Sequence, residues 1–189
     1  MDLQKLSKEA FETAKAHGWH DEKLPDETYL MLIITEIAEA VQADRNDRHA
    51  DVAKFKEWQG NILPLSEETR TRRFKEDFEE YIKNTVEDEL CDVIIRCLDL
   101  AALRGISMQY VDELLASDVE SISEPFPVVM YHLCEEHCLY KEALCEKLNL
   151  VVAVILVYCR QHDIDIDFFV DIKMRYNKLR PFKHGNKKY

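Results

Sequence analysis

The chain has 189 residues, of which 25 are lysine or arginine and 37 are aspartate or glutamate, and its net charge at pH 7 is −12. Hydrophobic residues at 47% and charged residues at 33% are typical of a soluble globular protein and exclude a disordered chain. The four glycines are far apart, which excludes glycine-rich phosphate loops and turn-rich β-sandwiches. A chain of this length forms one domain or two small ones.

The charge is unevenly distributed along the chain. All 37 acidic residues lie at or before Asp171, whereas seven of the 25 basic residues follow it. A body this acidic repels polyanions and is a poor surface for duplex nucleic acid, unless divalent cations neutralise part of it. The charge therefore raises the question of metal binding. Nucleic-acid binding is not expected, and only the basic tail has the charge to touch RNA.

The N-terminal sequence lacks the apolar core of a secretory signal, which favours a cytoplasmic protein. The longest apolar run, residues 150–159, has about half the length that a bilayer requires, so no membrane partner is expected and the run indicates a buried helix. The six cysteines lie at apolar helical positions and form no CxxC pair. Reduced thiols are therefore expected rather than a disulfide framework.

Apolar residues recur with a helical period through almost the whole chain, so the sequence predicts an all-α fold in the form of a helical bundle. Gly18 and Gly105 are placed as C-terminal stops of helices, and Ser66 as an N-terminal cap. Residues 47–65 are predicted to be irregular. Helices are expected at 2–17, 27–46, 66–83, 85–104, 107–117, 128–139, 141–161 and 166–178.

Two prolines within residues 121–127 mark the best position for an internal joint, which divides the chain into 1–120 and 121–189. The pentapeptide at 104–108 resembles the one at 162–166, and each follows a long helix. This likeness suggests a degenerate internal copy in the second half. The alternatives are a chance likeness between amphipathic helices and one undivided domain.

Two pairs of carboxylates lie in the most apolar of the expected helices. Glu36 and Glu39 form one pair, Glu89 and Asp92 the other, and the i, i+3 spacing places both members of a pair on one helix face. Like charges this close on a partly buried face are unfavourable unless they are protonated or bridged by cations. Four such carboxylates from two packed helices suit Mg²⁺ or Mn²⁺. The alternative is that they only edge an amphipathic stripe. The neighbouring acids Glu87, Asp88 and Asp99 are expected to be solvated or structural.

A second group of residues lies near the C-terminus. Lys173, Asn177 and Arg180 are spaced i, i+4, i+7 and so share one face of a helix that ends at Pro181. Lysine as a point charge and arginine as a bidentate fork are the groups that bind a polyphosphate. The alternative is a disordered basic tail.

Together these motifs resemble those of the MazG-type all-α nucleoside triphosphate pyrophosphohydrolases, whose signature is ExxE followed by ExxD on a later helix. Residues 32–45, with His-Gly-Trp-His upstream, resemble the first motif, residues 89–101 the second, and residues 173–185 the closing basic motif. The three stretches and their approaches cover roughly half the chain. Each is weak alone, and their order makes the resemblance specific.

The resemblance implies an enzyme, a hydrolase that cleaves a nucleoside triphosphate into a nucleoside monophosphate and pyrophosphate in nucleotide-pool housekeeping. Mg²⁺, or Mn²⁺ in its place, is expected to polarise the phosphoryl oxygens and activate the attacking water, with no covalent protein intermediate. The implied residues form two sets, catalytic metal ligands and substrate-binding groups. They are Glu36, Glu39, Glu89 and Asp92 for the first set, and Lys173, Asn177 and Arg180 for the second.

Two departures from the family pattern bear on assembly. Residues 46–84 separate the acidic motifs widely, and residues 109–167 stand between the second motif and the basic one. The family commonly builds its bundle from two subunits. We therefore expect either a homodimer or an intramolecular pseudo-dimer in which residues 124–166 supply the second copy.

Other functions have weaker support. The histidines and cysteines of 132–138 lack the paired-cysteine spacing of a zinc site, and a cysteine nucleophile is no better supported. Trp19 either stacks on a bound base or, as we favour, packs two helices together, and Trp58 could serve a lid. The rival function is a non-catalytic helical interaction protein, and a third is hydrolysis of another pyrophosphate-linked nucleotide, such as a phosphoribosyl-nucleotide. The sequence does not identify which base or which sugar the substrate nucleotide carries.

Overall fold

The computed structural model describes residues 1–61, 65–116, 122–135 and 143–183, and every regular element within these ranges is a helix. The predicted all-α fold is thereby confirmed. None of the helices in these ranges combines the length and the apolar character needed to cross a bilayer. In chain order they are α1 (Leu3–Ala16), α2 (Asp26–Arg45), α3 (Val52–Asn61), α4 (Glu67–Tyr81), α5 (Val86–Arg104), α6 (Tyr110–Ala116), α7 (Phe126–His132), α8 (Leu144–Gln161) and α9 (Ile166–Lys178).

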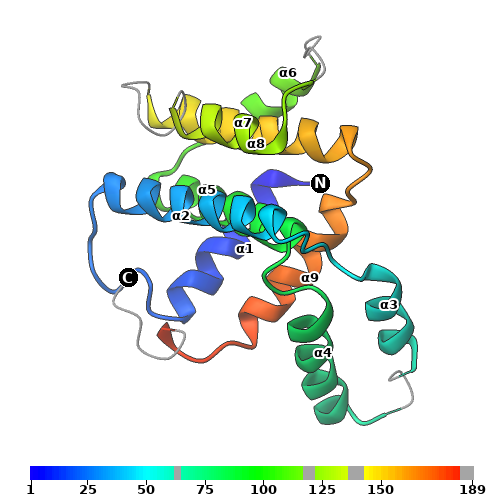
Figure 1. The fold of residues 1–189 in the computed structure, drawn as a ribbon. Coiled ribbons are helices and arrows are strands. Elements are labelled where there is room, and N and C mark those ends of the chain that lie inside the picture. The colour runs from blue at the N-terminus through cyan, green and yellow to red at the C-terminus, as the bar shows by residue number, and fades with distance from the viewer. Residues whose placement is uncertain (62–64, 117–121, 136–142, 184–189) are drawn as a thin grey trace.

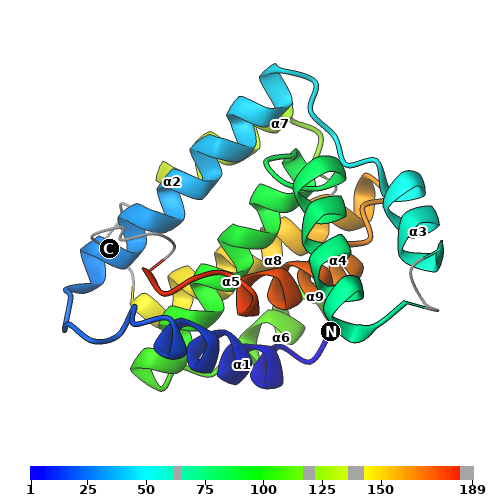
Figure 2. The same cartoon turned by 90° about the horizontal axis from the view of Figure 1, so that it is seen from below.

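The helices are stacked in three layers (Figure 1, Figure 2). The middle layer holds α2 and α5, one side is covered by α7 and α8, and α1, α4 and α9 lie on the other side. The central helix is α5, which contacts α1, α2, α8 and α9. Helices from before and after the predicted joint thus pack on one another. The division into two domains and the internal duplication stay predictions.

Local signals in the sequence explain the limits of α5. The hydroxyl of Thr85 accepts a hydrogen bond from the backbone N–H of Asp88 at 3.4 Å, which caps the first turn. Gly105 ends the helix at φ 67°, a left-handed conformation that favours glycine. Between these ends most of the circumference is apolar and buried, and most of the polar side chains of α5 share one strip. The predicted helices at 27–46, 85–104 and 166–178 agree with α2, α5 and α9 to within one residue.

The prediction that residues 47–65 are irregular is wrong, because α3 occupies their centre. Phe55 is the one buried hydrophobic residue of α3, and its ring packs edge-on against Phe74 of α4 at 6.0 Å and Phe168 of α9 at 6.1 Å. A short helix with a single anchor carries almost no amphipathic pattern, so its stability comes from tertiary packing. Trp58 therefore lies on a helix, where it is exposed.

The segment after α9 returns to the end of α1. The backbone N–H of Lys183 donates to the carbonyl oxygen of His17 at 3.0 Å, and His17 Nε2 lies 2.9 Å from the carbonyl oxygen of Arg180. The ring of Phe182 occupies the space beside Gly18, where an added Cβ would come within 2.3 Å of it. Gly18 also has φ +78°, so the turn requires glycine both for its backbone and for this contact. These contacts hold Arg180 beside α1.

Candidate functional site

A cleft of about 390 Å³ is lined by residues of α1, α2, α5 and α9. All seven residues that the sequence predicts for the site line this cleft. Packing of α2 and α9 against α5 therefore brings the acidic motifs and the basic motif together. The seven are Glu36 and Glu39 on α2, Glu89 and Asp92 on α5, Lys173 and Asn177 on α9, and Arg180 just after α9.

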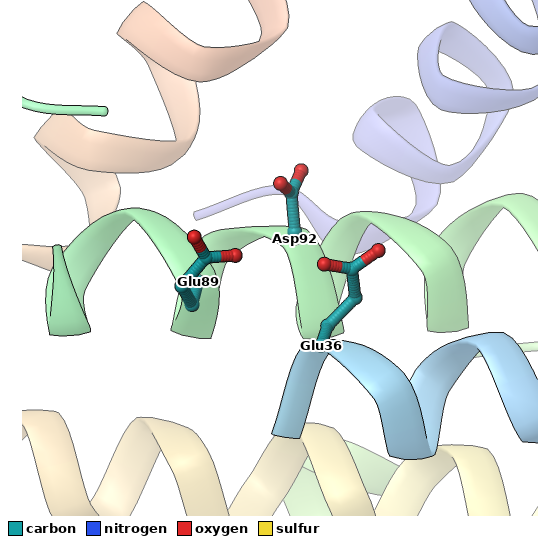
Figure 3. Close-up of side chains that lie close together, drawn as sticks. All are labelled: Glu36, Glu89 and Asp92. Carbon is teal, nitrogen blue, oxygen red and sulfur yellow. The ribbon is translucent and has the colours of Figure 1, made fainter. Parts of the chain in front are cut away.

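Three of the four predicted carboxylates converge on one point, and we call them the acidic trio (Figure 3). Glu89 and Asp92 project from α5, and Glu36 projects from α2 toward them. One oxygen of each carboxylate lies within 4.8 Å of the others. Glu36 and Glu89 are buried and Asp92 is half-buried. Glu39 lines the same cleft one turn further along α2, but it is exposed and lies outside the trio.

The local sequence explains why acids occupy so buried a position. Glu36 lies between Ile33 and Ile37, and Glu89 precedes Leu90, and these three apolar side chains are almost completely buried where α2 packs on α5. Because these neighbours are buried in the contact between α2 and α5, the carboxylates of Glu36 and Glu89 are buried too. Such an arrangement is unfavourable for ionised groups unless a cation lies nearby.

Burial and mutual repulsion shift the acid–base equilibria of the trio. Burial, reinforced by the charges of Asp92 and Asp88, raises the pKa of Glu89 to about 8. Burial and the charge of Asp92 also raise the pKa of Glu36, although Arg96 opposes this with an Nε–H donated to Glu36 Oε1 at 2.5 Å. The trio is therefore destabilised when fully ionised, and a bound cation would relieve that repulsion.

The free energy of unfolding of the metal-free protein is expected to fall between about pH 4.5 and pH 8 because of Glu89. Unfolded glutamate loses its proton near pH 4.5, whereas folded Glu89 holds it to about 8, so the folded state binds more protons in this window. The contribution is complete below the lower pH and lost above the higher one. We expect a loss on the order of a few kcal/mol. Urea unfolding in EDTA measures it, and a flat profile would contradict the shift.

Lys173 is held in buried ion pairs at the edge of the trio. Its Nζ lies 2.6 Å from Asp88 Oδ1 and 2.7 Å from Asp92 Oδ2, and the residue is only 3% exposed. Burial alone would lower the pKa of Lys173, but the carboxylates of Asp92 and Asp88 outweigh it and raise the pKa above its ordinary value. The protein therefore supplies one positive charge to the acidic motif from α9.

Asp88 also lines the cleft, and the sequence prediction did not assign it to the site. It is 2% exposed, and its Oδ2 accepts the backbone N–H of Asn84 at 2.9 Å while Oδ1 accepts Lys173. Burial raises the pKa of Asp88, and the Lys173 ammonium opposes this effect. The sequence offers only its position beside Glu89 as a signal. Its partner lies 85 residues away, so no local pattern could assign the contact.

Further polar groups complete the cleft. The Oδ1 atom of Asn177 is buried and makes no hydrogen bond within the part of the chain that the structure describes. The guanidinium of Arg180 lies 6.0 Å from the ring centre of Tyr176. Arg96, which lines the cleft, was also missed; its i+4 spacing from Asp92 was the available signal, since it places both on one face of α5. Cations from α5 and α9 thus border the acids.

The other predicted sites receive no added support. Of the histidine- and cysteine-containing segment 132–138, residues 136–138 lie outside the described ranges, and His132 is exposed, 3.7 Å from Glu135. Within the described ranges the cysteines are free thiols. Trp19 lines the cleft, whereas Trp58 lies on α3 outside the residues that line it.

Fold and cleft together define an all-helical protein with carboxylates and basic side chains facing one cavity. No protein-family model, curated protein or solved structure matches the chain. The function of the cleft must therefore be inferred from its residues and from the motif resemblance.

Proposed function

We propose that the cleft hydrolyses a nucleoside triphosphate to a nucleoside monophosphate and pyrophosphate with Mg²⁺. The observation that carries this proposal is the convergence of Glu36, Glu89 and Asp92, with oxygens within 4.8 Å, in a cleft that the basic residues of the α9 segment also line. A site of this kind combines cation ligands with groups that bind phosphate. The resemblance to the MazG-type motifs supports the same proposal.

The acidic trio fits Mg²⁺, or Mn²⁺, on chemical grounds. It offers hard carboxylate oxygens from two helices. Burial strengthens the repulsion between these carboxylates, and a bound cation would reduce that repulsion. When bound, Mg²⁺ would neutralise charge on the phosphate oxygens and polarise the phosphorus toward attack. Glu36, Glu89 and Asp92 would hold the ion, with the exposed Glu39 as the fourth carboxylate of the cleft.

The chain's own residues have the remaining roles. Arg180 and the Asn177 amide line the cleft and would donate hydrogen bonds to phosphate oxygens, and Lys173 adds positive charge beside Asp92. A water oxygen attacks the α-phosphorus, the bond to the bridging oxygen of the β-phosphate breaks, and pyrophosphate leaves. A carboxylate of the cleft takes the proton of the water.

Pyrophosphate release from a panel of standard and damaged nucleoside triphosphates, with and without Mg²⁺, tests the proposal. We expect Mg²⁺-dependent release that Asp92→Asn and Glu39→Gln each reduce by roughly 100-fold or more with unchanged helical content, because the first removes a proposed metal ligand and the second removes the fourth negative charge of the cleft. Glu80→Gln is the matched control, since Glu80 is exposed on α4 and lies outside the residues that line the cleft. Equal loss in the control would contradict the assignment.

A second candidate function is a non-catalytic helical interaction protein. It is favoured by the ion pairs of Lys173 with Asp88 and Asp92, which neutralise part of the acidic motif without any metal. This function predicts no metal-dependent turnover of any triphosphate. The same assay therefore separates the two.

A further inference from the structure

The cleft has a second end, away from the acidic trio, whose chemistry differs. Asp99 lies seven residues beyond Asp92 on the same face of α5, which is about 10 Å along the helix axis. Apolar and aromatic side chains line the cleft on this side, from the turn after α1 and from the first half of α2. They are Trp19, Leu24, Tyr29 and Leu32. One end thus suits phosphates and metal, and the other suits a flat heteroaromatic ring.

Asp99 is held in a fixed orientation by His20. The two side chains meet at 2.7 Å between His20 Nε2 and Asp99 Oδ1, and the His20 side chain is only 6% exposed and stacks on Phe11 with 5.0 Å between ring centres. His20 Nδ1 is buried and without a hydrogen-bond partner in the described ranges, so we assign the proton to Nε2, which donates to Asp99.

The second oxygen of Asp99 remains available to a ligand. No hydrogen bond or ion pair involves Asp99 Oδ2 within residues that the structure describes, and the side chain keeps 18% exposure in the wall of the cleft. An ionised carboxylate can only accept hydrogen bonds. A ligand group that reaches this oxygen must therefore be a donor.

The apolar wall beside Asp99 is fixed before any ligand binds. Arg104, at the end of α5, donates through Nε to Asp26 Oδ1 at 2.6 Å and through Nη2 to the carbonyl oxygen of Leu24 at 3.1 Å. Its guanidinium also lies 5.7 Å from the ring centre of Tyr29. These contacts tie the start of α2 to α5, so the pocket requires little rearrangement to accept a ring.

We propose that this end of the cleft binds the base of the nucleotide and that Asp99 selects bases with an exocyclic amino group. The inference rests on the proposed function for the phosphate end. An amino group, as on cytosine or adenine, donates to Asp99 Oδ2. A carbonyl in the same place, as on uracil or hypoxanthine, sets two acceptors against each other, and a buried acceptor left unpaired weakens binding.

Isothermal titration with α,β-methylene analogues of CTP and UTP in Mg²⁺ tests the inference, because these analogues cannot be cleaved between the α- and β-phosphates. We expect the cytosine analogue to bind roughly 10- to 100-fold more tightly, as for one hydrogen bond to a charged group. The adenine and hypoxanthine analogues should show the same contrast. Asp99→Asn should abolish it, because an amide can both donate and accept. Asp77→Asn is the matched control, since Asp77 is buried, accepts from Gln59 and lies outside the cleft lining.

The outcomes separate the inference from the function on which it rests. Equal binding of the amino and carbonyl analogues to the wild-type protein overturns the selection by Asp99 and leaves the hydrolase proposal standing. Absence of binding by all four analogues in Mg²⁺ overturns the triphosphate site itself. Discrimination that persists in Asp99→Asn overturns the assignment to this residue. The difference in affinity between amino and carbonyl analogues for the wild-type protein tests base selection even if Asp99→Asn fails to fold.

Discussion

Glu89→Gln is expected to reduce Mg²⁺-dependent pyrophosphate release by roughly 1,000-fold while stabilising the metal-free protein at pH 8.5. Glutamine keeps the volume of the side chain but removes a negative metal ligand, so the loss of activity is electrostatic. The same change removes a buried ionised group that burial and the charges of Asp92 and Asp88 disfavour, so the free energy of unfolding should rise. A substitution that lowers activity but raises the free energy of unfolding identifies a functional residue, because loss of a structural residue would lower both.

Glu87→Gln provides the matched control, because Glu87 is buried two residues earlier on α5. Its Oε1 lies 2.9 Å from His49 Nδ1, and its Oε2 accepts the backbone N–H of Ala50 at 3.0 Å. These contacts tie the entry of α3 to α5, so this substitution should lower stability by about 1–3 kcal/mol and leave turnover nearly unchanged. Urea unfolding and pyrophosphate assays of both variants supply the comparison. Loss of stability in Glu89→Gln would contradict the prediction.

Lys173→Met is expected to destabilise the metal-free protein by about 3–5 kcal/mol and to increase its affinity for Mn²⁺ about tenfold. The substitution leaves the buried carboxylates of Asp88 and Asp92 without their shared cation, which carries the large penalty of an uncompensated buried charge. It also frees an Asp92 oxygen and removes a positive charge beside the acidic trio. A divalent ion should then bind more tightly and restore part of the lost stability.

Electron paramagnetic resonance titration of Mn²⁺, together with urea unfolding with and without Mn²⁺, measures both effects. The double variant Asp88→Asn/Lys173→Met isolates the cause, because it removes one of the two orphaned charges and should recover part of the stability of the single variant. Turnover should stay low in both, since neither retains the ammonium at the phosphate end. Unchanged Mn²⁺ affinity in Lys173→Met would show that the lysine does not compete with a cation.

The helices and their faces were predictable because the signals that specify them are local. The 3.6-residue period, the cap at Thr85 and the left-handed Gly105 all act within a few residues of α5. The i, i+3 spacing likewise places Glu89 and Asp92 on one face without knowledge of the rest of the chain. The prediction that carboxylates and basic residues share a site needed more than spacing. It came from the motif resemblance, and the cleft now gives it a geometry.

The helical period of the sequence by itself determined an all-α fold and the helix faces that carry the predicted site residues. The tertiary structure decided which of these residues meet. It brought Glu36 into the acidic trio, left Glu39 exposed at the side, and placed Lys173 between Asp88 and Asp92. It also made a helix of α3, through a single buried ring. The physical reason is that these contacts join segments far apart in the chain, whose distances depend on how α2, α4 and α9 pack and on no pattern within one helix.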